Sequence, residues 1–167
     1  MKNNLLFIHG LESTLSEAKK EILAQFGQVY APIIDYKSDE NSIEKIIKQF
    51  NSEKITHIIG RSMGGFAGFY IANYLQVPAL LFNPALLERS VLQNIPNFIS
   101  STDSFKSIVL GKLDRVVPNE KVFQFFEQQP LWNSNVTFTL EPEMEHRIPV
   151  DLFEKNVTQF FNLLNNE

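Results

Sequence analysis

The stretch Gly60-Arg61-Ser62-Met63-Gly64 decides how this sequence is interpreted, because its residue types fit a sharp turn between a strand and a helix. An apolar run of strand length, residues 55–59, comes directly before it, and an apolar run with helical character, residues 66–75, follows. In such a turn the serine adopts a strained backbone that holds its hydroxyl clear of the sheet. Glycines on either side avoid a side chain where strand and helix crowd together. This pattern, a nucleophile elbow, is typical of a serine that attacks a carbonyl group.

Short apolar runs alternate with longer helical patterns along the whole chain, which indicates a parallel β-sheet with helices on both faces. The first helix is expected to begin at a capping box, Thr14 with Glu17, and to end at Gly27. The second is expected to begin at the cap pair Asn41 and Glu44. Strands are expected at residues 5–8, 29–34, 55–59, 79–82, 107–110 and 136–140, and the last two helices from residue 119 and over residues 153–164.

A chain of 167 residues is most simply one domain, residues 1–167, and is large enough for a core. Its content of 44% hydrophobic and 20% charged residues is typical of a globular protein. A formal net charge of −4 argues against a nucleic-acid partner, which would need a concentrated basic surface. The absence of cysteine excludes a disulfide, a thiol nucleophile and a thiolate metal site. The first apolar run, residues 5–8, is too short for a signal sequence or a membrane span, so we expect a cytoplasmic protein without a membrane partner. No sequence pattern predicts the oligomeric state.

A serine nucleophile needs a base, and the chain has three histidines from which to choose it. His57 lies inside the run that leads to Ser62 and is too close in sequence to turn back onto the hydroxyl. His9 ends the first apolar run, where the backbone is expected to contribute and not the imidazole. His146 follows the last strand, at the sheet edge where open α/β sheets place their sites. We therefore expect His146 to be the base; the alternative is a solvated loop histidine.

The carboxylate that orients the base is expected between serine and histidine in the chain, which is the order found with this kind of elbow. Asp114 fits, because it follows the strand over residues 107–110. Its alternative role is a turn aspartate that caps the backbone of Val116 or Val117. Asp103 precedes that strand and so lies at the opposite edge. Three acids close to His146 in sequence are expected to be solvated: Glu141, Glu143 and Glu145.

The developing oxyanion needs backbone N–H donors, one from the residue after the nucleophile and one from the loop after an earlier strand. Met63 supplies the first, at the start of a helix whose dipole favours negative charge. The turn His9-Gly10-Leu11 supplies the second through Leu11. No metal or organic cofactor is required by this arrangement.

These residues, with the segments 7–14, 59–65 and 81–85, resemble the α/β-hydrolase superfamily and more narrowly the small bacterial YqiA-type esterases. The resemblance spans essentially the whole chain. It implies about six parallel strands in the order 2-1-3-4-5-6, without the two N-terminal antiparallel strands of the full superfamily. It also implies that Leu11 lies beside Ser62 and that residues 85–104 form a reduced lid.

Two residues depart from the family pattern. His146 follows Glu141-Pro-Glu-Met-Glu145 and not a glycine-rich turn, which bears on the pose of its imidazole. Arg61 occupies a position that is commonly histidine or a small residue. It could contact an anionic substrate, or it could pair with a surface acid.

The leading hypothesis is a serine hydrolase that cleaves small carboxylic esters or thioesters through an acyl-enzyme. Two alternatives remain: a hydrolase-like binding protein with little or no catalytic activity, and a flavodoxin-like or dinucleotide-binding domain. The last lacks both the Gly-x-Gly-x-x-Gly pattern and a Walker lysine. Four apolar residues of the lid candidate suggest an acyl site, or else ordinary lid packing: Leu92, Ile95, Phe98 and Ile99.

Overall fold

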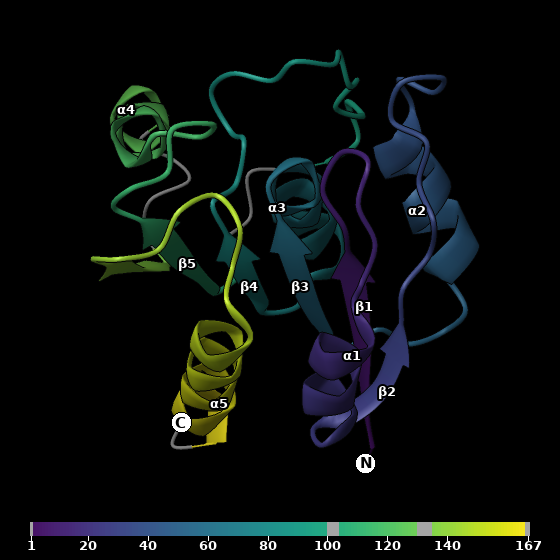
Figure 1. Ribbon diagram of the computed structural model, residues 1–167. Coiled ribbons are helices and arrows are strands. Elements are labelled where there is room, and N and C mark those ends of the chain that lie inside the picture. Colours follow the sequence, from purple (N-terminus) through teal and green to yellow (C-terminus); the bar gives the residue numbers. More distant parts are fainter. Residues whose placement is uncertain (1, 100–103, 130–134, 166–167) are drawn as a thin grey trace.

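The computed structural model describes residues 2–99, 104–129 and 135–165, and these ranges contain a six-stranded sheet (Figure 1). All neighbouring strands are parallel, and their order is β2-β1-β3-β4-β5-β6. This confirms the expected α/β-hydrolase sheet order. The strands are β1 (Asn3–Ile8), β2 (Gly27–Tyr30), β3 (His57–Arg61), β4 (Ala79–Phe82), β5 (Lys106–Gly111) and β6 (Val136–Glu141).

Helices cover both faces of the sheet, as the alternating pattern predicts. On one face α1 and α5 pack together, and on the other lie α2, α3 and α4. The split follows the two-residue period of a strand: Leu5 and Phe7 of β1 face α1 and α5, whereas Leu6 and Ile8 face the opposite layer. The helices are α1 (Glu17–Ala24), α2 (Ser42–Phe50), α3 (Met63–Leu75), α4 (Asn119–Gln128) and α5 (Val150–Asn165).

Helix and strand ends differ from the expected ones near α1 and β2. The N-cap of α1 is Ser16, whose hydroxyl accepts from the Lys19 amide, so the capping box at Thr14 is wrong. Gly27 begins β2 and does not end the helix; a Cβ there would overlap the backbone of Asn3 on β1. The second strand ends at Tyr30, before Pro32 removes a backbone donor.

The starts of α2 and α4 agree with the expected ones. Asn41 is the N-cap of α2, although its side chain makes no capping hydrogen bond. Helix α4 begins at Asn119, with Pro118 as its N-cap.

His57 lies on a face of the sheet, as expected for a residue inside β3. Its ring packs against those of Phe160 and Phe161 on α5, with centroids 6.1 and 5.0 Å away. Burial lowers the pKa of this imidazole from its usual value near 6.5 to about 4. His57 is therefore a half-buried residue that packs against α5, away from the sheet edge where β3 ends.

The carboxyl ends of the parallel strands all meet at one edge of the sheet, and α3 begins there directly after β3. This is the edge where open α/β sheets hold their ligands. Among the described residues, no helix combines the length and the apolar character needed to cross a membrane.

We expect replacement of Leu80 by alanine to lower the free energy of unfolding by about 2–5 kcal/mol, because this side chain is fully buried on the central strand β4. The matched change Leu92→Ala removes a side chain that is 68% exposed and should change stability by less than about 0.5 kcal/mol. Urea denaturation of both variants measures this difference. Equal losses in the two variants would contradict the assignment of Leu80 to the core.

We expect His57 to make the protein less stable as the pH falls. The unfolded chain takes up this proton near pH 6.5, whereas the folded protein resists it until about pH 4. The contribution is therefore fully present above about pH 6.5 and is lost as the pH falls towards 4. The difference between the denaturation midpoints at about pH 7 and about pH 5 should be larger for the wild type than for His57→Gln. An identical fall in both proteins would show that another group is responsible.

Candidate active site

Ser62 stands in the sharp turn between β3 and α3, with a φ of 52° and a ψ of −117°. A positive φ is strained for a residue with a side chain. The turn is held by hydrogen bonds from the Ser62 amide to the Phe82 carbonyl, 2.9 Å, and from the Ala85 amide to the Ser62 carbonyl, 3.1 Å. The hydroxyl does not cap α3, although Ser62 is its N-cap residue. The expected strained turn is thus present, and its hydroxyl is not used by the helix.

The two glycines of the turn are required by the close approach of backbone segments. A Cβ on Gly60 would overlap the Gly64 carbonyl. A Cβ on Gly64 would overlap the carbonyl oxygens of Ile8 and His9 at the end of β1. The expected crowding is confirmed, and for Gly64 the crowding partner is the neighbouring strand.

Asp114 and His146 are hydrogen-bonded: the imidazole Nδ1 donates to the carboxylate Oδ2 at 2.8 Å. The Asp114 side chain is 0% exposed, and its Oδ1 accepts from the amides of Val116 at 2.8 Å and Val117 at 2.9 Å. The hydrogen bonds expected for both roles of this aspartate are therefore present at once. Because Nδ1 carries the proton in this pair, the neutral ring keeps Nε2 as an acceptor. The His146 side chain remains 22% exposed.

The loop that carries His146 is attached to the end of β5. The Leu113 amide donates to the Met144 carbonyl at 3.1 Å, and a Cβ on Gly111 would overlap that same carbonyl. Asn83 at the end of β4 adds a second attachment: its Nδ2 donates to the Glu145 carbonyl at 3.2 Å, and its Oδ1 accepts from the Gly111 amide at 2.7 Å. These contacts fix the pose of His146 without a glycine-rich turn.

Sequence reasoning assigned no role to Asn83. Its φ is 42°, in a region that asparagine tolerates better than most residues, and it is buried. Its position directly after the buried strand β4 and before Pro84 was the available signal for a special turn.

Glu141 was expected to be solvated, and this is wrong. It is buried, accepts from Lys155 Nζ at 2.8 Å and from Asn156 Nδ2 at 2.9 Å, and so links β6 to α5. Glu143 and Glu145 are exposed, as expected. Asp103, the other acid considered for the orienting role, lies outside the described residues.

The turn after β1, His9-Gly10-Leu11, lies against the Ser62 turn; a Cβ on Gly10 would come 3.3 Å from the Ser62 Cβ. The His9 ring is buried, and its Nε2 accepts from the Ile34 amide at 2.8 Å. Its Nδ1 therefore donates to the Gly10 carbonyl at 2.6 Å. The His9 imidazole thus stabilises the turn through hydrogen bonds, whereas only the backbone was expected to contribute here.

A cavity of about 320 Å³ brings the predicted residues together, since Ser62, His146, Leu11 and Met63 all line it. As the first residue of α3, Met63 has an N–H that no carbonyl of its own helix accepts. Among the described residues, no hydrogen bond joins the Ser62 hydroxyl to His146. The rest of the lining comes from residues 10, 61, 85, 88–90, 116 and 117.

The four apolar residues proposed for an acyl site do not line this cavity, so that interpretation is wrong for the described structure. Phe98 packs against Tyr74, with ring centroids 5.4 Å apart, and Ile99 packs against the core. The described part of the lid candidate, residues 85–99, is instead anchored by the buried Gln93, whose Nε2 donates to the carbonyls of Tyr36 and Asp39, both at 2.9 Å.

Arg61, the last residue of β3, lines the same cavity. It forms no ion pair with any residue that the structure describes, so the expected pairing with a surface acid is wrong. Its Nε is buried without a hydrogen-bond partner in the described residues. In those ranges no group of three or more histidine, aspartate and glutamate side chains is placed to hold a metal ion.

Comparison with solved structures gives the fold of known hydrolases at low sequence identity. Est1E from Butyrivibrio proteoclasticus matches with a TM-score of 0.72 and 18% identity over 99% of this chain and 89% of that one. A putative hydrolase of the alpha/beta superfamily from Xanthomonas campestris matches with a TM-score of 0.64 and 18% identity over all of both chains. A monoacylglycerol lipase from Paleococcus ferrophilus matches with a TM-score of 0.70 and 14% identity over 98% of this chain and 95% of that one.

These likenesses show the α/β-hydrolase fold. A search among curated proteins found no significant match. The model of the uncharacterised protein family UPF0227 matches residues 4–100, which is more than half of the 167 residues. The chain therefore belongs to the UPF0227 family, in agreement with its resemblance to YqiA-like proteins.

Proposed function

We propose that this protein is a serine hydrolase that cleaves small carboxylic esters or thioesters through an acyl-enzyme. The observation that carries the proposal is the hydrogen bond between His146 and the buried Asp114, on a cavity that also contains Ser62 at the head of its strained turn. The esterase and lipase folds found among similar structures support the same chemistry. No metal or organic cofactor takes part.

In the first half of the proposed reaction, His146 Nε2 accepts the proton of the Ser62 hydroxyl while the oxygen attacks the carbonyl carbon. The amides of Leu11 and Met63 donate to the oxygen that becomes negative. When the tetrahedral intermediate collapses, the carbon–oxygen or carbon–sulfur bond breaks and the leaving group takes the proton from Nε2. Water repeats these steps against the acyl-enzyme and releases the acid.

Asp114 supports this cycle through its hydrogen bonds. One carboxylate oxygen is fully occupied by two backbone amides, so the carboxylate cannot rotate away from the imidazole. The other oxygen holds Nδ1–H and stabilises the imidazolium that forms during each proton transfer.

A hydrolase-like binding protein is the second candidate, and one observation favours it: the described residues show no hydrogen bond between Ser62 and His146. Such bonds are often long before substrate binds, which is why we place catalysis first. Labelling with a fluorophosphonate separates the two, because only an activated serine reacts with it. A folded but unreactive protein would support binding alone.

We expect p-nitrophenyl acetate to give a burst of about one equivalent of p-nitrophenol, followed by slower turnover, because acylation precedes deacylation. Ser62→Ala should abolish the burst and lower kcat by at least about 1,000-fold. The matched control Ser52→Ala removes an exposed hydroxyl just after α2 and should keep the burst. Equal turnover by wild type and Ser62→Ala would exclude the proposed mechanism.

We expect Asn83→Ala to lower kcat by about 10- to 100-fold with little change in KM, because Asn83 acts by holding the His146 loop and does not touch the substrate cavity. Asn83 can matter for its positive φ or for its side-chain hydrogen bonds, and Asn83→Gly separates these two effects. Glycine tolerates the positive φ but makes neither hydrogen bond. Steady-state kinetics should show these two variants equally impaired, with the exposed Asn162→Ala as control. Full activity of Asn83→Gly would mean that only the backbone conformation matters.

A further inference from the structure

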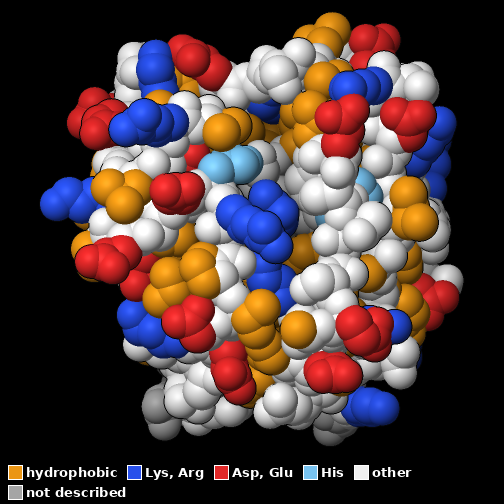
Figure 2. All heavy atoms as spheres, viewed as in Figure 1, with side chains coloured by type: hydrophobic (Ala, Val, Ile, Leu, Met, Phe, Trp, Pro, Cys, Tyr) orange, Lys and Arg blue, Asp and Glu red, His pale blue; other side chains and the backbone are white. Residues whose placement is uncertain are grey.

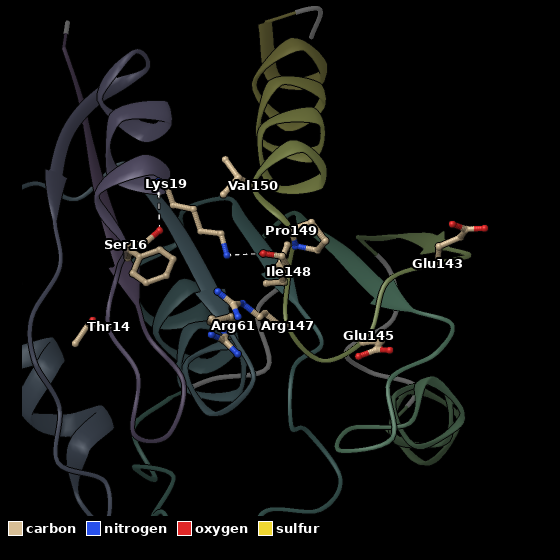
Figure 3. Close-up of a pocket in the computed structure, with 11 residues that line it drawn as sticks. Thr14, Ser16, Lys19, Arg61, Glu143, Glu145, Arg147, Ile148, Pro149 and Val150 are labelled. Atoms are coloured by element: carbon tan, nitrogen blue, oxygen red, sulfur yellow. Dashed lines mark hydrogen bonds between the residues drawn. The ribbon is translucent and has the colours of Figure 1, made fainter.

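A second cavity, of about 580 Å³, adjoins the candidate active site and contains three cationic side chains: Lys19, Arg61 and Arg147. They come from α1, from the end of β3 and from the segment before α5 (Figure 3). Figure 2 shows lysine and arginine side chains gathered in the middle of this face of the molecule. Arg61 lines both cavities and is bonded in sequence to Ser62, so the two cavities meet at this residue.

The described part of the chain offsets the positive charge in this cavity only in part: the Asp114 carboxylate raises the pKa of Arg61 but forms no ion pair with it. None of the three cations forms an ion pair with a described carboxylate. Glu143 and Glu145 also line the cavity, but in Figure 3 their carboxylates are drawn apart from the cationic group, and neither forms an ion pair with it. Burial, followed by the neighbouring charges of Arg61 and Arg147, lowers the pKa of Lys19 to about 8. The three side chains therefore repel one another in the absence of an anion.

The arginines of this cavity also have hydrogen-bond donors without acceptors among the described residues. The guanidinium groups of Arg61 and Arg147 overlap in Figure 3 and are close enough for the charge of Arg147 to lower the pKa of Arg61. The buried Arg61 Nε has no partner among the described residues. Lys19 is held in place because its Nζ donates to the Ile148 carbonyl at 2.6 Å. A buried donor without an acceptor costs free energy. The terminal N–H groups of Arg61 and Arg147, which form no hydrogen bond with a described residue, would donate to an oxyanion in the cavity.

Two helices begin at the wall of the same cavity. Ser16, the N-cap of α1, lines it, as does Val150, the first residue of α5. Helix N-termini carry unpaired N–H groups and a partial positive charge, both of which favour an anion. The two helix N-termini add to the positive electrostatic potential of the cavity, most of which comes from the three cations.

We propose that this cavity binds a phosphate group of the substrate, so that the protein acts on small esters whose acyl or alcohol part also carries a phosphate monoester. The identity of the substrate rests on the proposed function, whereas the presence of an anion site does not depend on it. A phosphate monoester fits better than a carboxylate, because its two negative charges and three terminal oxygens match three cations with several donors. Arg61 would touch the phosphate while Ser62 attacks the ester of the same molecule.

The anion site is tested without catalysis, by calorimetric titration of inorganic phosphate into Ser62→Ala at fixed ionic strength set with chloride. We expect saturable binding that weakens about tenfold when Lys19→Gln or Arg147→Gln is added. The matched control Lys20→Gln removes the same charge from the adjacent, exposed position of α1 and should leave binding unchanged. No binding, or equal binding in all four proteins, would overturn the site whatever the esterase activity.

The substrate is tested with 1-butyrylglycerol 3-phosphate and 1-butyrylglycerol, which differ only by the phosphate. Each hydrolysis consumes one water and releases butyrate, which a pH-stat measures. We expect the wild type to favour the phosphorylated ester by about tenfold or more in kcat/KM, and this ratio to fall in Lys19→Gln and Arg147→Gln but not in Lys20→Gln.

Equal rates on the two esters, with phosphate binding intact, would mean that the cavity holds free phosphate and would overturn the substrate assignment. If the wild type cleaves neither ester and gives no burst with p-nitrophenyl acetate, the proposed function fails together with this substrate. The titration of Ser62→Ala then still decides whether the anion site exists.

Discussion

The close approach of α3 to the end of β1 is the constraint on which the rest of the site depends. Gly64 at the start of the helix lies against the carbonyls of Ile8 and His9, with no room for a side chain. This contact drives the turn into the strained conformation at Ser62, which costs about 1–3 kcal/mol and is held by the hydrogen bonds to Phe82 and Ala85. The same contact brings the turn after β1 to the serine, so one packing event places the hydroxyl beside this turn.

The other half of the site is organised by the end of β5. Asp114 binds two amides of its own turn and the imidazole of His146, while Gly111 leaves room for the incoming loop. Asn83 joins this unit to β4, the strand next to the one that carries Ser62. The histidine is thus attached to the sheet by several short contacts, which explains how it reaches the serine's cavity from a loop with no glycine-rich turn.

Sequence reasoning succeeded where the information is local or is fixed by strand order. The turn at Ser62, the strand β4 and the edge occupied by Asp114 and His146 all follow from short patterns and from the rule that parallel strands end together. It failed where a residue finds its partner in another element. Glu141 looked like a solvated acid because Lys155 and Asn156 lie on the following helix, and Asn83 bonds to a loop more than sixty residues away. Contacts of this kind depend on side-chain directions that only the assembled fold determines.

Arg61 illustrates how far a local pattern can mislead about charge. Pairing with a surface acid was the simpler expectation for this residue, yet Arg61 forms no ion pair with a described residue and shares a cavity with Lys19 and Arg147. Burial and the charge of Arg147 lower the pKa of this guanidinium by more than the Asp114 carboxylate raises it, so keeping two arginines and a lysine together costs free energy. A cluster that disfavours the free protein in this way gains most from a ligand that neutralises it. Because Arg61 follows Gly60 in β3 and precedes the nucleophile, such a ligand would be fixed at one end within reach of the Ser62 hydroxyl. In the proposed reaction, charge at this position would act through the orientation of the substrate.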